Sequence, residues 1–250
     1  MSLYVKHYGS GRQLVLLHGW SFHSDVWQSI IPVLSEHWQV TVIDFPGFGR
    51  SEMLEGSYSI EQIAELMLPH INSSSTILGW SMGGYVAMHL AKYYPERVLG
   101  LMTTGCNPKF LEDDAWSGVS LDFFETFCQQ VRLKAGKALR QFCLLMQQGQ
   151  ENPTNYYKYL LSLLLKYGEP SVSALRYGLE ILNSRDMRDS LLKIQCPQLH
   201  IYGDGDLLAK FNEGSINTKV YQQCGHIPFI SHQKDFIADT SNFMRELNDV

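Results

Sequence analysis

Residues 76–84 read Thr76-Ile77-Leu78-Gly79-Trp80-Ser81-Met82-Gly83-Gly84. A β-branched, apolar run leads into the pattern Gly-x-Ser-x-Gly, and residues 85–94 follow with helical spacing. A strand that turns sharply into a helix is the setting of a nucleophile elbow, where a serine is held in a strained backbone conformation. Gly79 and Gly83 lack the Cβ atoms that would collide in such a turn. The pattern predicts that Ser81 is a nucleophile, exposed beside the free N–H groups of a helix N-terminus.

Strands and helices alternate on both sides of this segment. Residues 13–17 form a continuous apolar run, which is typical of a strand covered on both faces of a parallel sheet. The same reading predicts further strands at 38–43, 76–80, 98–103, 198–202 and 219–222, with a weaker edge strand at 3–8. Helices are predicted at 25–34, 60–68, 85–94, 189–193 and 233–247. Such alternation predicts an α/β fold with a mostly parallel central sheet flanked by helices.

The alternation stops between about residues 107 and 185, where we find no convincing strand. Helical spacing dominates there, over 121–132, 137–148, 155–167 and 172–182. We therefore expect one α/β core in two parts, 1–106 and 188–250, interrupted by a helical lid at 107–187.

Composition narrows the class of protein. The chain has 250 residues, of which 45% are hydrophobic and 18% charged, so it can bury a sizeable core. The net charge of −5 argues against general nucleic-acid binding. The cysteines lack paired metal spacing and are read as reduced thiols: Cys106, Cys128, Cys143, Cys196 and Cys224. With no signal-like N-terminus and no membrane-length apolar run, we expect a cytoplasmic protein without membrane contact.

A serine nucleophile needs a base, and on this kind of sheet the order along the chain is Ser, then Asp or Glu, then His. Our choice of base is His226, because glycine and proline flank it in a loop between the last strand and the last helix. His89 falls within a helix, and His200 lies inside an apolar strand, where a core histidine is expected. His232 precedes the last helix and suits a capping or surface role.

Two aspartates follow the strand that ends at Tyr202. Both Asp204 and Asp206 lie at the carboxyl end of a strand, where open α/β sheets place reactive residues. Glycines and aspartates also make ordinary surface turns. We choose Asp206 as the acid that orients His226, and Asp204 as a residue that forms the turn.

The oxyanion formed during attack on a carbonyl needs two N–H donors. One is expected from Met82, the residue after the nucleophile. The other is expected from Trp20, in the loop after the strand at 13–17, where Gly19 allows close backbone approach. The alternative role of Trp20 is a core aromatic. His18 is expected to support this loop by hydrogen bonding.

These motifs together resemble the α/β-hydrolase superfamily. The resemblance rests on Leu16 to Trp20, Asp44 to Ser51, Gly79 to Gly84 and Pro95 to Val98. More narrowly, three segments are similar to the pimeloyl-acyl-carrier-protein methyl ester esterases of biotin synthesis: the elbow, Tyr177 to Leu182, and His226 to His232.

The resemblance implies a serine carboxylesterase without cofactor or metal, which releases methanol from a carrier-bound methyl ester. It implies that the substrate lies against Trp20, Ser81 and Met82 and against the lid run Phe142, Cys143, Leu144, Leu145 and Met146. That family also has lid arginines that hold the acidic acyl-carrier protein. This chain departs from that pattern, because the matching positions hold Lys137, Gln141, Thr154 and Lys158.

The charge of the lid independently favours an acidic partner. Between residues 130 and 166 the only acid is Glu151, against six basic residues: Arg132, Lys134, Lys137, Arg140, Lys158 and Lys166. A basic patch attracts an acidic partner over a distance, and Lys137, Arg140 and Lys158 are our candidate docking residues. The alternative is that these side chains are only the solvated faces of lid helices.

Other functions stay open at this point, because the fold does not determine the reaction. A general short-chain carboxylesterase, a lactonase or a hydrolase of carbon–carbon bonds would use the same triad. A ligand-binding protein that retains the triad is a more distant alternative. We expect a monomer.

Overall fold

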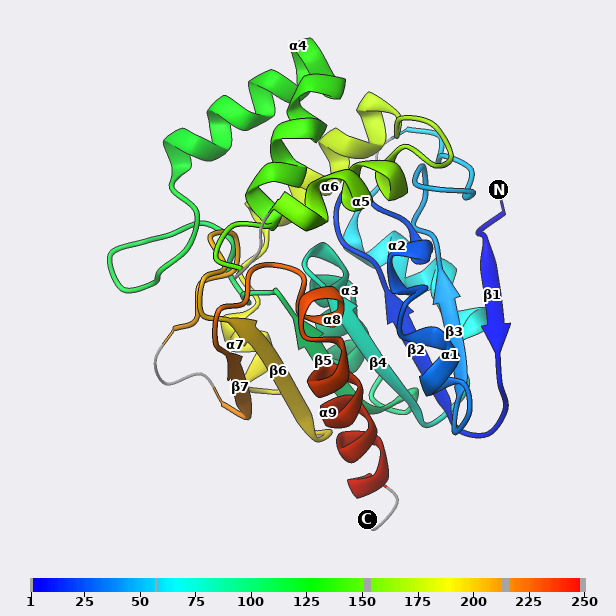
Figure 1. Ribbon diagram of the computed structural model, residues 1–250. Coiled ribbons are helices and arrows are strands. Elements are labelled where there is room, and N and C mark those ends of the chain that lie inside the picture. The colour runs from blue at the N-terminus through cyan, green and yellow to red at the C-terminus, as the bar shows by residue number, and fades with distance from the viewer. Residues whose placement is uncertain (1, 57, 151–153, 213–215, 248–250) are drawn as a thin grey trace.

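A seven-stranded sheet forms the centre of the protein, seen here in a computed structural model (Figure 1). The structure describes residues 2–56, 58–150, 154–212 and 216–247. The strand order is β1-β3-β2-β4-β5-β6-β7, and only β1 runs antiparallel to its neighbour. The strands are β1 (Val5–Tyr8), β2 (Gln13–Leu17), β3 (Gln39–Ile43), β4 (Ser75–Trp80), β5 (Val98–Thr104), β6 (Gln198–Gly203) and β7 (Thr218–Tyr221). The predicted mostly parallel sheet is confirmed.

Burial on both faces explains why the central strands are apolar throughout. All residues of β2 and β4 are buried. Leu16 of β2 pairs with Val42 of β3 on one side and with Leu78 of β4 on the other. This register brings the carboxyl ends of β2 and β4 together, so the loops after Leu17 and Trp80 leave the sheet side by side.

Helices cover both faces of this sheet. On one face α1 (Ile31–Leu34) packs against α9 (Gln233–Glu246), and on the other α2 (Ile60–Met67) and α7 (Arg188–Leu191) pack against α3 (Met82–Tyr93). Short helices complete the core: η1 (Ser24–Trp27), η2 (Leu68–His70) and α8 (Pro228–Ser231). The helix α2 begins with a capping box, in which Ser59 and Gln62 exchange hydrogen bonds.

The single helix predicted over 25–34 is wrong. The chain instead forms η1, a turn, and then the four-residue α1. Pro32 is the physical reason. Proline has no N–H to donate to the carbonyl of the preceding helical turn, so it is tolerated in the first turn of a helix but not in its interior. Pro32 lies in the first turn of α1.

The helical insertion is formed by α4 (Leu121–Met146), α5 (Thr154–Leu164) and α6 (Val172–Ser184). Figure 1 shows these helices stacked over one end of the sheet. The two helices predicted at 121–132 and 137–148 are arms of α4, which kinks at Lys134, where φ is −149° and ψ is 60°. The chain enters the insertion beside the point where it leaves it, because the amide N–H of Met187 donates to the carbonyl oxygen of Pro108 at 2.7 Å. We call this contact the neck, and it lies at our proposed boundaries of 107 and 187.

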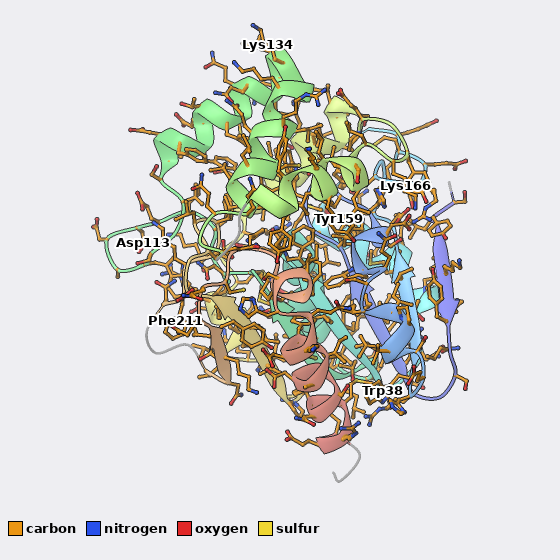
Figure 2. The ribbon with its side chains drawn as sticks, viewed as in Figure 1. Trp38, Asp113, Lys134, Tyr159, Lys166 and Phe211 are labelled. Atoms are coloured by element: carbon orange, nitrogen blue, oxygen red, sulfur yellow. The ribbon has the colours of Figure 1, made fainter. Side chains whose placement is uncertain are left out.

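A polar cluster fastens the end of α5 to the core, and we call it the lid latch: His23, Asp25, Arg50, Lys166 and Tyr167. Asp25 accepts hydrogen bonds from Arg50 at 2.8 Å, Lys166 at 2.5 Å and the Tyr167 hydroxyl at 2.8 Å. Burial raises the pKa of Asp25, but these donors outweigh it and lower that pKa to about 2. His23 Nε2 also lies 2.7 Å from the carbonyl oxygen of Leu163 in α5. Figure 2 places Lys166 where the lid meets the core.

His200 should make the protein less stable in acid. It is buried in β6, bonded to Thr103 and Gln198, and burial lowers its pKa to about 4. Between pH 6.5 and 4 the unfolded chain binds a proton there that the folded protein does not, so the free energy of unfolding falls as pH falls. The contribution is on the order of 3 kcal/mol.

Replacing His200 with asparagine should therefore reduce the fall in free energy of unfolding between pH 6.5 and 4, as measured by urea denaturation, while the contribution of the equally buried His18 remains. His37→Asn, at an exposed position, serves as the control. A slope unchanged by His200→Asn would contradict the assignment.

Candidate active site

Ser81 lies in the turn between β4 and α3, in a strained backbone conformation. Its φ is 53° and its ψ is −121°, a region that residues with a Cβ rarely occupy. The Ser81 N–H donates to the carbonyl of Thr104 in β5 at 3.0 Å, which holds the turn against the sheet. This is the geometry of a nucleophile elbow.

Two glycines allow that turn because neighbouring backbone comes too close for a side chain. A Cβ at Gly79 would lie 2.3 Å from the carbonyl oxygen of Gly83. A Cβ at Gly83 would lie 2.4 Å from the carbonyl oxygen of Leu17. The collisions expected from the sequence are therefore found, and the second one involves the strand that leads to Trp20.

The structure brings His226 and Asp206 together. His226, between β7 and α8, lies with Nδ1 2.8 Å from Oδ2 of Asp206, which follows β6. The other carboxylate oxygen of Asp206 accepts from the amides of Leu208 at 2.8 Å and Ala209 at 3.1 Å. Both side chains are almost completely buried. Asp204 is exposed, and its carboxylate accepts from the amide of Cys224, as a turn-forming residue would.

His226 is held next to the elbow by residues on either side of it. The indole N–H of Trp80 donates to the His226 carbonyl at 2.8 Å. Gly105, next to the Thr104 that binds Ser81, lies so close that a Cβ there would be 3.1 Å from His226 Nδ1. Within the described residues Nε2 is buried without a hydrogen-bond partner, and no hydrogen bond joins it to Ser81. Such catalytic hydrogen bonds often form only when substrate is bound.

The expected oxyanion donors, Trp20 and Met82, both have free amides among the residues that the structure describes. Met82 is the first residue of α3, so its N–H has no partner within the helix. Trp20 follows β2 and is buried. These two amides come from the adjacent loops at the carboxyl ends of β2 and β4.

His18 supports the loop that carries the Trp20 amide by hydrogen bonding, as predicted. The amide of Phe45 donates to His18 Nε2 at 2.8 Å, so Nδ1 carries the proton and donates to the Gly19 carbonyl at 2.8 Å. In a trans peptide the carbonyl and the following N–H point in opposite directions. Holding the Gly19 carbonyl therefore directs the Trp20 N–H away from His18. Burial lowers the pKa of His18 to about 4, which keeps the ring uncharged at neutral pH, so that Nε2 can accept from Phe45.

An apolar cavity under the lid faces Ser81. Its free volume is about 20 Å³, room for about one water molecule. The lining is Trp20, Ser81, Phe110, Val119, Phe123, Phe124, Phe127, Phe142, Leu145, Leu179, Leu182 and Leu208. The Trp20 ring meets Phe142 edge-on, with centroids 4.9 Å apart. A ligand larger than a few atoms therefore needs lid side chains to move before it can enter.

The predicted lid run 142–146 divides between three places. Phe142 and Leu145 line the cavity. Leu144 is 44% exposed and lines a separate shallow depression, whereas Cys143 and Met146 are buried outside the cavity lining. Most other lining residues were missed by sequence reasoning. Phe110 and Val119 lie in the loop before α4, which has no periodic pattern to mark them.

The remaining histidines make structural contacts. His200 is the expected core histidine, and the His89 ring lies 4.6 Å from that of Tyr93 within α3, tilted by 38°. His232 bonds to the Ser231 hydroxyl and the carbonyl of Gln222. In the described ranges no three side chains of His, Cys, Asp or Glu are grouped as metal ligands. No described helix is long and apolar enough to span a bilayer.

The chain belongs to the α/β-hydrolase fold family, whose profile matches residues 13–233. The pimeloyl-[acyl-carrier protein] methyl ester esterase of Aeromonas hydrophila is 33% identical over 253 residues, covering 98% of this chain and 100% of that protein. The enzyme of the same name from Serratia marcescens is 35% identical over 252 residues, with 97% and 98% covered. Among solved structures, an esterase from Exiguobacterium antarcticum shares the fold, with a TM-score of 0.87 and 23% identity over 97% of this chain and 95% of that one.

Proposed function

We propose that this chain is a serine carboxylesterase that hydrolyses the methyl ester of pimeloyl-acyl-carrier protein in biotin synthesis. The observation that carries the proposal is similarity along the whole chain, lid included, to enzymes of that name. The buried Asp206–His226 pair beside the strained Ser81 supports nucleophilic attack on a carbonyl carbon, which ester hydrolysis requires.

The reaction proceeds through an acyl-enzyme. Ser81 Oγ attacks the ester carbonyl carbon and its proton passes to His226 Nε2, while Asp206 stabilises the imidazolium that forms. The carbonyl oxygen becomes an oxyanion and accepts hydrogen bonds from the amides of Trp20 and Met82. The C–O bond to the methoxy group then breaks, and His226 protonates the leaving group to give methanol.

Water completes the cycle by the same route. His226 removes a proton from water, and the water oxygen attacks the acyl carbon. As the second tetrahedral intermediate collapses, the C–Oγ bond breaks and His226 returns the proton to Ser81 Oγ, which releases the free acid and restores the serine. All steps use groups of this chain, and we propose that no cofactor or metal takes part.

Once lid side chains have moved, the lid would hold a long acyl chain with its carrier outside. The cavity over Ser81 shares Phe123, Phe127 and Leu145 with the shallow depression that opens beside Leu144. A chain whose ester lies at Ser81 would leave through this apolar path. It would reach the surface next to Gln141, one residue from the basic Arg140.

Growth without biotin tests the proposal. The gene should restore growth on biotin-free medium to a bacterial strain that lacks its own esterase of this kind, and Ser81→Ala should not. Failure to restore growth, with the protein present at normal level by immunoblot, would overturn the assigned substrate. Turnover of free p-nitrophenyl esters at a higher kcat/KM than the carrier-bound ester would favour a general esterase.

The three candidate docking residues give a separate prediction. Lys137, Arg140 and Lys158 are exposed and make no ion pair within the described residues, whereas Lys166 is bound in the lid latch. Reversing their charge to glutamate should lower kcat/KM for the carrier-bound ester about tenfold or more at low salt, because encounter with an acidic partner slows. The loss should shrink in high salt.

The same triple variant should hydrolyse free p-nitrophenyl butyrate normally. Lys6, Lys193 and Lys234, which are exposed elsewhere on the protein, provide a control triple with the same change in net charge. Equal losses in the two triples would show that net charge, and not this site, is responsible.

A further inference from the structure

The lid helix α6 lies directly against both expected oxyanion residues. The indole N–H of Trp20 donates to the carbonyl of Leu175, in the first turn of α6, at 2.8 Å. This bond joins residues 155 positions apart in the chain. Three residues further along, and so on the same face of the helix, Gly178 points at the same loop.

Gly178 has no space for a side chain. A Cβ there would lie 2.6 Å from Trp20 Cδ1, 3.1 Å from Trp20 Nε1 and 3.0 Å from Met82 Sδ. The first distance is shorter than any that a real Cβ tolerates, and the indole atoms are not the free end of a flexible chain. One position of α6 thus touches the side chains of both residues whose amides form the oxyanion hole.

The backbone of α6 does not itself need glycine at 178. Gly178 lies within a regular helix and is not among the residues with positive φ. A glycine inside a helix costs about 1 kcal/mol relative to alanine. Close approach to Trp20 and Met82 is therefore what the glycine provides.

We propose that α6 positions the oxyanion hole, with the Leu175 carbonyl and the bare Cα of Gly178 holding Trp20 and Met82 in place. This inference rests on the proposed esterase function. His18 holds the peptide before Trp20, and α6 holds its indole, so the donor amide is fixed from both sides. Gly178 is a positioning residue, and seating of the lid is thereby coupled to formation of the hole.

The variant Gly178→Ala tests this inference. It should lower kcat for p-nitrophenyl butyrate about 10- to 100-fold, because displacing one donor amide weakens binding of the transition state. KM should change less than threefold, and the Tm should fall by no more than about 5 °C, because the gain in helix propensity partly offsets the crowding around the new Cβ. The inhibition constant of a boronic acid, whose adduct with Ser81 imitates the tetrahedral intermediate, should rise by the same factor as kcat falls.

Gly136→Ala is the matched control. It also replaces a glycine inside a lid helix, but the new Cβ would meet only the carboxylate end of Glu169, 2.6 Å away, which can rotate aside. This variant should keep kcat within twofold of the wild type.

Relief of the clash gives the second test. Trp20→Ala keeps the backbone N–H at position 20 and removes Cδ1 and Nε1, the indole atoms that the new Cβ meets. In a Trp20→Ala background, adding Gly178→Ala should cost less than threefold in kcat. The inference is overturned if Gly178→Ala leaves kcat within twofold, raises only KM, or costs as much in the Trp20→Ala background as in the wild type. Wild-type protein that hydrolyses no ester would instead overturn the proposed function.

Discussion

Ser81→Ala should lower kcat for p-nitrophenyl butyrate by about 10⁴- to 10⁶-fold. Without the hydroxyl no acyl-enzyme can form, and only the oxyanion amides remain to assist direct attack by water. The substitution keeps a Cβ at φ 53°, so the strain of the turn is unchanged and the Tm should stay within a few degrees. Stopped-flow and steady-state rates on the purified variant provide the measurement.

Ser162→Ala is the control for this experiment. Ser162 is exposed on α5 and bonds only within its own turn, to the Tyr159 carbonyl. Its loss should leave kcat unchanged. If Ser81→Ala retained a tenth of the wild-type rate, Ser81 would not be the nucleophile.

Asp206→Asn should lower kcat by about 10³- to 10⁴-fold. The reason lies in the amides of Leu208 and Ala209, which donate to Oδ1 of Asp206. They would hold the amide oxygen of an asparagine and turn its NH₂ toward His226 Nδ1. Nδ1 must then accept a hydrogen bond, so the proton moves to Nε2 and the imidazole can no longer act as base toward Ser81.

Asp204→Asn is the matched variant two residues away. Its amide oxygen can still accept from the Cys224 N–H, which Asp204 binds at 3.1 Å. We expect kcat within threefold of the wild type. A large loss in Asp204→Asn together with a small one in Asp206→Asn would reverse the assignment of the acid.

Local sequence was sufficient for the parts of the protein that depend on neighbouring residues. The continuous apolar run of β2 and the capping box at Ser59 could be predicted because burial on two faces and a helix start have short patterns. The elbow could be predicted for the same reason, since Gly79 and Gly83 touch backbone only a few residues away or in the adjacent strand. The kink at Lys134 corresponds to the gap between two predicted helices.

Features that join distant segments could not be predicted in this way. The segment around Gly178 carries a family resemblance, but its local pattern gives no physical reason for the glycine, because that reason is Trp20 in another part of the chain. The cavity wall could not be predicted either, because Phe110 and Val119 come from a loop whose sequence has no periodicity. Lys166 shows the opposite error. The sequence places it in the basic patch of the lid, whereas in the structure it forms an ion pair with Asp25 of the core.

The lid latch limits how freely this insertion could be exchanged between related hydrolases. His23, Asp25 and Arg50 belong to the core, yet their partners Leu163, Lys166 and Tyr167 belong to the insertion. A chimaera that grafted a foreign insertion at the neck would leave the Asp25 carboxylate and the His23 ring without these donors and acceptor. To keep these contacts, a chimaera must therefore take residues 23–25 and 50 from the same protein as the insertion that they bind.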